Sequence, residues 1–120
     1  MKTILLTLSM LITFSAYADI SAKDALNITT QDAFVRLKDH FQLESPDQLR
    51  DSISIAKAKD LRQIDDQEFR NILKKYPRQS AFYINVQMND CVVQSMLYII
   101  EKKSGKIRAT IFIGDEISIQ

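Results

Sequence analysis

The stretch that decides the fold is SAFYINVQMNDCVVQSMLYIIEKKSGKIRATIFI, residues 80–113. From residue 82 to 88, apolar and more polar residues alternate strictly, which is the period of a half-buried strand. Asn89–Asp90 is a turn pair, because both residues tolerate unusual backbone angles. Two further apolar runs follow, at 91–100 and 106–113. The sequence therefore predicts a meander of three antiparallel strands.

The lengths of the two turns predict the register of these strands. A two-residue turn at Asn89–Asp90 places Phe82 opposite Leu97. A three-residue loop that ends at Gly105 places Leu97 opposite Ile111, and loops of this class end in a left-handed residue, usually glycine. The predicted core face of the central strand then consists of alternate residues: Cys91, Val93, Ser95, Leu97 and Ile99.

The other face of the central strand is also apolar. The predicted register places Tyr83 and Phe112 on either side of Met96, so an apolar and aromatic band crosses the sheet. Either another part of the chain covers this band, or it is a partner-binding or dimer surface, because large exposed apolar patches are uncommon on monomers. The candidate partner-binding residues are Tyr83, Met96, Tyr98, Ile100 and Phe112.

Residues 1–18 have the pattern of a signal peptide. Lys2 supplies a positive start, Ile4 to Phe14 is mostly apolar, and Ala16–Tyr17–Ala18 matches the small-x-small cleavage pattern. The apolar run is shorter than the roughly 20 residues of a membrane span, and no cysteine near the cleavage site offers a lipid anchor. We expect cleavage near Ala18 and a periplasmic or secreted protein with no stable membrane anchor.

The remaining chain predicts a flexible segment at 19–28 and one α+β domain at 29–120. The whole chain has 16 Lys and Arg against 15 Asp and Glu, so its net charge is +1, and removal of Lys2 brings it to about zero. This balance argues against nucleic acid as a general partner, because phosphate binding needs a basic excess or a basic face. It also argues against simple adhesion to anionic lipid.

Two helix-start signals lie in the first half of this domain. Thr29 or Thr30 can cap a helix over 31–42, whose stripe of Phe34, Leu37 and Phe41 recurs at helical spacing. Ser45 can cap a second helix, with Pro46 at its first position and Gln48 returning a hydrogen bond to the cap. Residues 52–55 alternate like a strand, but the surrounding sequence favours continuation of this helix.

A third helix is predicted from Asp65 to Pro77. Asp65 can cap its start, and the following apolar residues lie at helical spacing. Pro77 stops the helix. Lys74, Lys75 and Arg78 form a small basic cluster at this end, either a solvated helix end or an anion-binding patch. The apolar stripe consists of Phe69, Ile72, Leu73 and Tyr76.

The sequence contains no recognisable catalytic, cofactor-binding or metal-binding motif, so it predicts no enzyme and no cofactor. Cys91 is the only cysteine, which leaves a buried thiol or an intermolecular disulfide. His40 is the only histidine and is expected to be partly buried beside Phe41. A pair of carboxylates brought together by the fold would still permit acid–base chemistry.

These observations predict an α+β fold, with two to three N-terminal helices packed on one face of a three- to four-stranded antiparallel meander. Residues 116–119 are the candidate fourth strand. The leading functional hypothesis is a small exported protein-binding module, such as an inhibitor, a toxin-immunity protein or an envelope-assembly accessory, whose partner is another protein or a second copy of the chain. The alternatives are a carrier of a small apolar ligand held between helices and sheet, and a carboxylate-dependent hydrolase.

Overall fold

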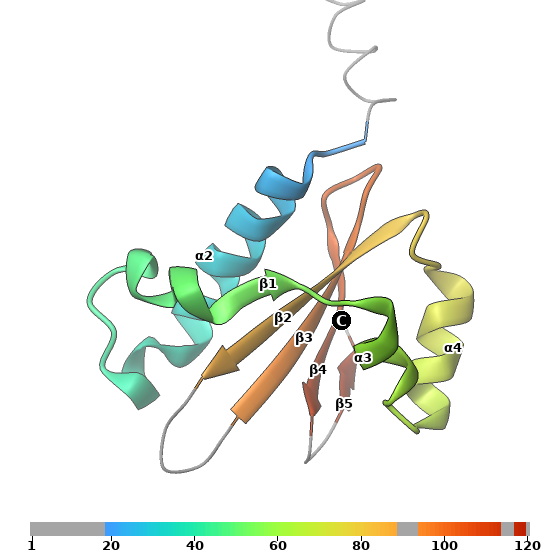
Figure 1. Cartoon of the computed structure of the whole chain (residues 1–120). Helices are drawn as coiled ribbons and strands as arrows, with labels where there is room; N and C mark the ends of the chain where they lie inside the picture. The colour runs from blue at the N-terminus through green and yellow to red at the C-terminus, as the bar shows by residue number, and fades with distance from the viewer. Residues whose placement is uncertain (1–18, 89–93, 114–116, 120) are drawn as a thin grey trace, which may run out of the picture.

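A computed structural model describes residues 19–88, 94–113 and 117–119. These residues form helices and one antiparallel sheet with the strand order β1-β2-β3-β4-β5 (Figure 1). The predicted α+β class is confirmed, and all the described helices precede the meander β2–β5. In chain order the elements are α2 (Ala22–Phe41), the 3-10 helix η1 (Pro46–Ser52), β1 (Ile53–Ile55), α3 (Ala58–Arg62), α4 (Gln67–Lys75), β2 (Ala81–Met88), β3 (Gln94–Glu101), β4 (Ile107–Ile113) and β5 (Ile117–Ile119).

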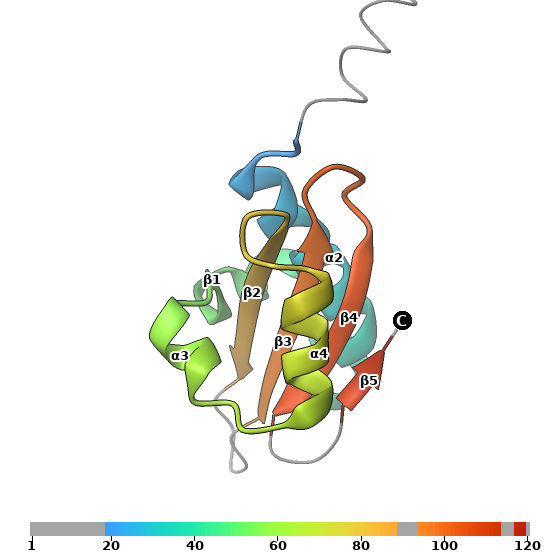
Figure 2. The same ribbon diagram turned by 90° about the vertical axis from the view of Figure 1, so that its right-hand side faces the viewer.

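Helices cover both faces of the sheet. Helix α2 lies across one face, and α3 and α4 lie on the other (Figures 1 and 2). The expectation that all helices pack on one face is therefore wrong. Because side chains alternate between the faces of a strand, the central strand β3, whose residues are apolar or aromatic from Met96 to Ile100, supplies both layers. Its odd-numbered residues Leu97 and Ile99 face α4, and its even-numbered residues Met96, Tyr98 and Ile100 face α2.

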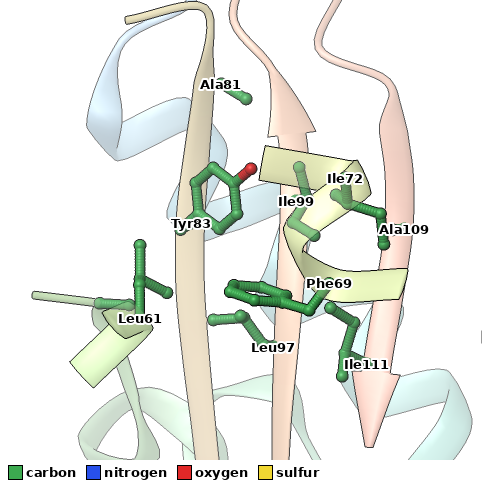
Figure 3. Close-up of a cluster of buried hydrophobic side chains, with 10 residues drawn as sticks. Leu61, Phe69, Ile72, Ala81, Tyr83, Leu97, Ile99, Ala109 and Ile111 are labelled. Carbon is green, nitrogen blue, oxygen red and sulfur yellow. The ribbon is translucent and has the colours of Figure 1, made fainter. Parts of the chain in front are cut away.

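The layer under α4 is built around one aromatic pair. Phe69 of α4 is fully buried and meets the ring of Tyr83 of β2 edge-on, with the ring centroids 6.2 Å apart (Figure 3). The Tyr83 hydroxyl donates a hydrogen bond to the carbonyl oxygen of Tyr76 at 2.5 Å, so the polar tip of this buried ring is satisfied. The other buried members are Ala56, Leu61, Ile72, Ala81, Leu97, Ile99, Ala109 and Ile111.

Helix α2 begins earlier than predicted. Ser21, rather than Thr29 or Thr30, caps it, and Asp24 completes a capping box by accepting from the Ser21 backbone N–H. Residues 22–28, which we assigned to a flexible segment, are therefore helical, and Ala25 is completely buried against the sheet. The buried positions recur every fourth residue: Ala25, Thr29, Ala33 and Leu37.

The second start signal leads to a short helix and a strand. The Gln48 side chain accepts a hydrogen bond from the Ser45 N–H, as predicted, but the segment is a 3-10 helix that ends at Ser52. Residues 53–55 instead pair with β2 as the edge strand β1, which corrects the predicted continuous helix. The alternating run Ile53–Ser54–Ile55 forms ladder hydrogen bonds with β2, and this pairing outweighs the local helix propensity.

The predicted register is correct for one pair of strands and wrong for the other. Leu97 lies opposite Ile111, as expected, and Gly105 in the connecting loop has a φ of +70°. Between β2 and β3, however, Phe82 lies opposite Ile100 instead of Leu97. A shift by an odd number of residues reverses the facing of every side chain in one strand relative to the other. The predicted turn at Asn89–Asp90, and with it Cys91, lies outside the described residues.

The last predicted strand is present. Residues 117–119 form β5, which pairs antiparallel with β4 at the far edge of the sheet from β1. The meander thus has four strands, and β1 adds a fifth to the sheet.

Candidate functional site

The predicted partner-binding face is not a surface. Met96, Tyr98 and Ile100 are between 0% and 3% exposed beneath α2, and Phe112 is half-buried in the same cluster. Tyr83 lies on the opposite face of the sheet, under α4. The β2–β3 register causes this separation, because its odd shift moves Tyr83 away from the even-numbered residues of β3. The five residues therefore cannot form one docking surface, and the reading in which the chain covers its own apolar band is the one observed.

Tyr98 holds α2 to the sheet. Its hydroxyl donates to Asp32 Oδ2 at 2.6 Å, and Arg36 Nε donates to the same oxygen at 2.7 Å. Burial, and then the bond to the Asp32 carboxylate, raises the pKa of Tyr98 far above its usual range. Tyr98 stays neutral and connects β3 to Asp32 of α2, so we assign it a structural role and not a catalytic one.

An open pocket lies on the α3 side of the sheet. It has a volume of about 450 Å³, which falls in the usual range of roughly 300–1,000 Å³ for small-molecule sites. Helix α3 and the link to α4 form its outer wall, and β2 and β3 form its floor. Its lining residues are Ala56, Asp60, Leu61, Gln63, Ile64, Asp65, Asn85, Ser95 and Leu97.

The floor of this pocket is polar at two positions. Asn85 of β2 lies directly opposite Leu97 in the ladder, and Ser95 lies two residues before Leu97 on the same face of β3. Both side chains are half-buried, and neither has a hydrogen-bond partner among the residues that the structure describes. The amide and the hydroxyl are thus available to donate to or accept from a bound molecule.

The walls and rim divide by chemistry. Ala56, Leu61 and Ile64 form an apolar wall, and the first two are buried. The Asp60 carboxylate stands at the rim and makes no ion pair within the described part of the chain. Among the described residues that line the pocket there is no Lys, Arg or His. The pocket therefore combines an apolar wall, a neutral polar floor and an acidic rim.

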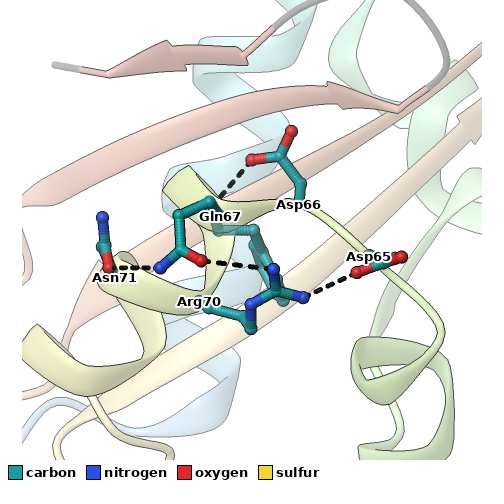
Figure 4. A network of polar contacts seen from close by, with 6 residues as sticks. Asp65, Asp66, Gln67, Arg70 and Asn71 are labelled. Atoms are coloured by element: carbon teal, nitrogen blue, oxygen red, sulfur yellow. Dashed lines mark hydrogen bonds and ion pairs between the residues drawn. The ribbon is translucent and has the colours of Figure 1, made fainter.

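The second rim carboxylate, Asp65, is already engaged. Asp66 caps α4 by accepting from the Phe69 N–H at 3.1 Å, which corrects the predicted cap at Asp65. Asp65 instead accepts from Arg70 Nη1 at 2.6 Å (Figure 4). Since the Asp65 side chain is mostly exposed, this ion pair adds little stability, but it holds the link between α3 and α4 beside the pocket.

The other residues noted in the sequence lie apart from this pocket. His40 is exposed, not partly buried as expected, and its ring meets that of Phe41 at a centroid distance of 4.6 Å. Lys74, Lys75 and Arg78 are exposed at the other end of α4. Among the described residues, no three His, Cys, Asp or Glu side chains are grouped closely enough to hold a metal ion.

Sequence reasoning missed the pocket as a site. Ser95 carried the one available signal, because it is a polar residue on the predicted core face of the central strand. Asn85 stood only among the more polar residues of the alternating run 82–88. Asp60 gave no signal, since a single acid on a short helix is ordinary.

Comparison with protein-family models, with curated proteins and with solved structures finds no match to this chain. No helix in the described ranges is both long enough and apolar enough to span a membrane.

Proposed function

We propose that the protein is a binding protein for a small, largely apolar ligand, which enters the pocket between α3 and the sheet. The observation that carries this proposal is an open pocket of about 450 Å³ whose floor presents Asn85 and Ser95 without partners in the described chain. Binding sites of this kind combine an apolar lining with a few polar groups that orient the ligand. The apolar part of the ligand lies against Leu61, Ile64 and Leu97, and a hydrogen-bonding group reaches the floor.

This proposal takes the place of the protein-binding module that the sequence favoured. That hypothesis drew on the apolar band, and Met96 and Tyr98 of the band are buried. It now rests on export and small size alone. A partner protein that inserts one apolar side chain into the pocket is an alternative occupant, and probe titration of wild type and Ile64→Trp separates it from a free ligand.

The hydrolase hypothesis requires two carboxylates close together in a cleft. Asp60 and Asp65 do line the same pocket, but Asp65 is bound to Arg70 and is open to solvent. General acid–base catalysis works best with a carboxyl whose pKa has been raised by burial or by a like charge. The arrangement supports binding better than proton transfer.

We also propose that the protein is exported and that residues 1–18 are removed. The support is the leader pattern, with Lys2, an apolar run and Ala16–Tyr17–Ala18. Expression in a bacterial host followed by mass spectrometry of the recovered protein tests this proposal. An N-terminus at Asp19 agrees with it, and an intact Met1 in the cell interior contradicts it.

A fluorescent apolar probe tests the pocket. N-phenyl-1-naphthylamine becomes bright in an apolar site, so a titration gives its Kd directly. Ile64→Trp places a large ring at the half-buried wall of the pocket, and we expect it to weaken probe binding about tenfold or more, as about 1.4 kcal/mol of lost affinity corresponds to tenfold.

The matched control is Val35→Trp, which adds the same ring on the outer face of α2, where Val35 is 66% exposed. This variant keeps the wild-type Kd. If Ile64→Trp also binds the probe as well as wild type does, the pocket is not the site. A different result would assign the pocket to a protein side chain instead. In that case the folded wild-type protein binds neither this probe nor any of a panel of small apolar compounds, but it captures a partner protein that Ile64→Trp no longer binds.

A further inference from the structure

The near-zero net charge of the protein conceals a strong separation of charge. The last turn of α4 and the turn after it carry Lys74, Lys75 and Arg78. The loop between β3 and β4 carries Lys102, Lys103 and Lys106. These two clusters are far apart in the sequence, and we call them together the basic end.

The fold brings the two clusters to the same end of the sheet. Lys102 N–H donates to the Ser80 carbonyl oxygen at 2.9 Å, and Ser80 N–H donates to that of Pro77 at 2.8 Å, so the β3–β4 loop and the turn after α4 are joined. Both views show these segments at one end of the molecule, with α3 and the start of α4 at the other (Figures 1 and 2).

The cations of the basic end are not neutralised by neighbours. Glu101 is the only acid in the segments 74–80 and 101–108, and it is bound to Arg108 at 2.8 Å. None of the six lysine and arginine residues of the basic end forms an ion pair within the described chain. Four of these lysines, Lys74, Lys75, Lys103 and Lys106, are exposed. The start of α2 adds Asp19, Lys23 and Asp24 nearby, which leaves the end strongly positive.

The N-terminal leader pattern favours a membrane as the anionic surface that the basic end meets. Ile20 N–H donates to the Lys102 carbonyl oxygen at 2.8 Å, so the described chain begins at the basic end. The apolar run from Ile4 to Phe14 is joined to this same end. In the proposed export, a leader of this kind directs the chain across a membrane, so the protein folds beside a membrane surface.

We propose that the basic end binds electrostatically to the surface of a membrane that contains anionic phospholipids. Lysine near such a surface contributes about fivefold in affinity per residue, so several unpaired lysines on one end give measurable binding without an inserted anchor. The inference does not depend on the pocket, which lies at the opposite end. It departs from the expectation, drawn from net charge alone, that the protein does not adhere to anionic lipid.

Co-sedimentation with vesicles tests the inference on the protein purified after export. We expect binding to vesicles that contain phosphatidylglycerol, little binding to vesicles of phosphatidylcholine alone, and release as the salt rises well above about 0.15 M. The triple variant Lys74→Gln, Lys103→Gln, Lys106→Gln should bind on the order of 100-fold more weakly. All three side chains are exposed, so circular dichroism should show an unchanged fold.

The matched control removes three exposed lysines elsewhere, Lys38→Gln, Lys57→Gln and Lys59→Gln, with the same change in net charge. This variant keeps wild-type vesicle binding. Equal losses in the two triple variants would overturn the inference, because binding would then follow net charge and not the basic end. Tight binding to duplex DNA together with no binding to vesicles would also overturn it and assign the basic end to another polyanion.

Discussion

Substitution of Met96 by alanine tests whether both faces of the sheet are covered. In the structure Met96 is 3% exposed and packs in the layer between α2 and the sheet. Truncation of a fully buried methionine to alanine costs about 2–5 kcal/mol, because apolar contacts are lost and a cavity remains. On an exposed sheet face the same change would alter stability by no more than about 0.5 kcal/mol.

Urea unfolding followed by far-UV circular dichroism measures this difference. For a domain of this size the slope is about 1–3 kcal/mol per molar urea, so a cost near 3 kcal/mol lowers the midpoint by about 1–3 M. Val35→Ala on the exposed face of α2 is the control, with an expected change within about 0.5 kcal/mol. If the urea midpoint of Met96→Ala equals that of Val35→Ala, α2 does not cover the even-numbered residues of β3 and the placement is refuted.

Three further predictions concern single contacts. Burial raises the pKa of Tyr83 to about 12, so the free energy of unfolding should decline above about pH 10, where the unfolded state but not the folded state loses the tyrosine proton. Tyr83→Phe loses the hydrogen bond to the Tyr76 carbonyl oxygen, so urea unfolding should show it about 1 kcal/mol less stable at neutral pH but with a smaller alkaline decline. Gly105→Ala should cost about 1–2 kcal/mol, seen as a lower Tm, because the φ of +70° strains any residue with a Cβ, and an unchanged Tm would contradict the loop geometry. The hydrogen bond from Arg108 lowers the pKa of Glu101, so Arg108→Ala should raise that pKa in an NMR titration of the carboxyl groups, whereas an unmoved pKa would show that the pair does not form in solution.

The candidate sites illustrate what a sequence can show about function in a chain without motifs. The pocket combines residues from five segments, since Ala56, Asp60, Ile64, Asn85 and Ser95 meet only when α3 folds over the β2–β3 ladder. Apart from Ser95, a polar residue on the predicted core face, none of them stands out in the sequence as a binding residue. The sequence showed one cluster of the basic end, Lys74, Lys75 and Arg78. The second cluster, in the β3–β4 loop, lies beside it only because β2 pairs with β3.

The sequence alone determined the elements whose signals are local. The three strands of the meander, the register across the Gly105 loop and the helix that ends before Pro77 follow from periodicity, turn length and end signals within a few residues of each position. The class of the fold followed from their order.

Only the tertiary structure decided which side chains share a face and which charges share an end. The register between β2 and β3 depends on the length of their connection. An odd error there put Tyr83 and Met96 on the same face, whereas the observed register places them on opposite faces. Residues 53–55 form a strand because they pair with β2, and local propensity cannot predict that pairing. Net charge is a sum over the whole chain, whereas a membrane or a ligand meets only one end of the folded molecule, so the distribution of charge had to come from the fold.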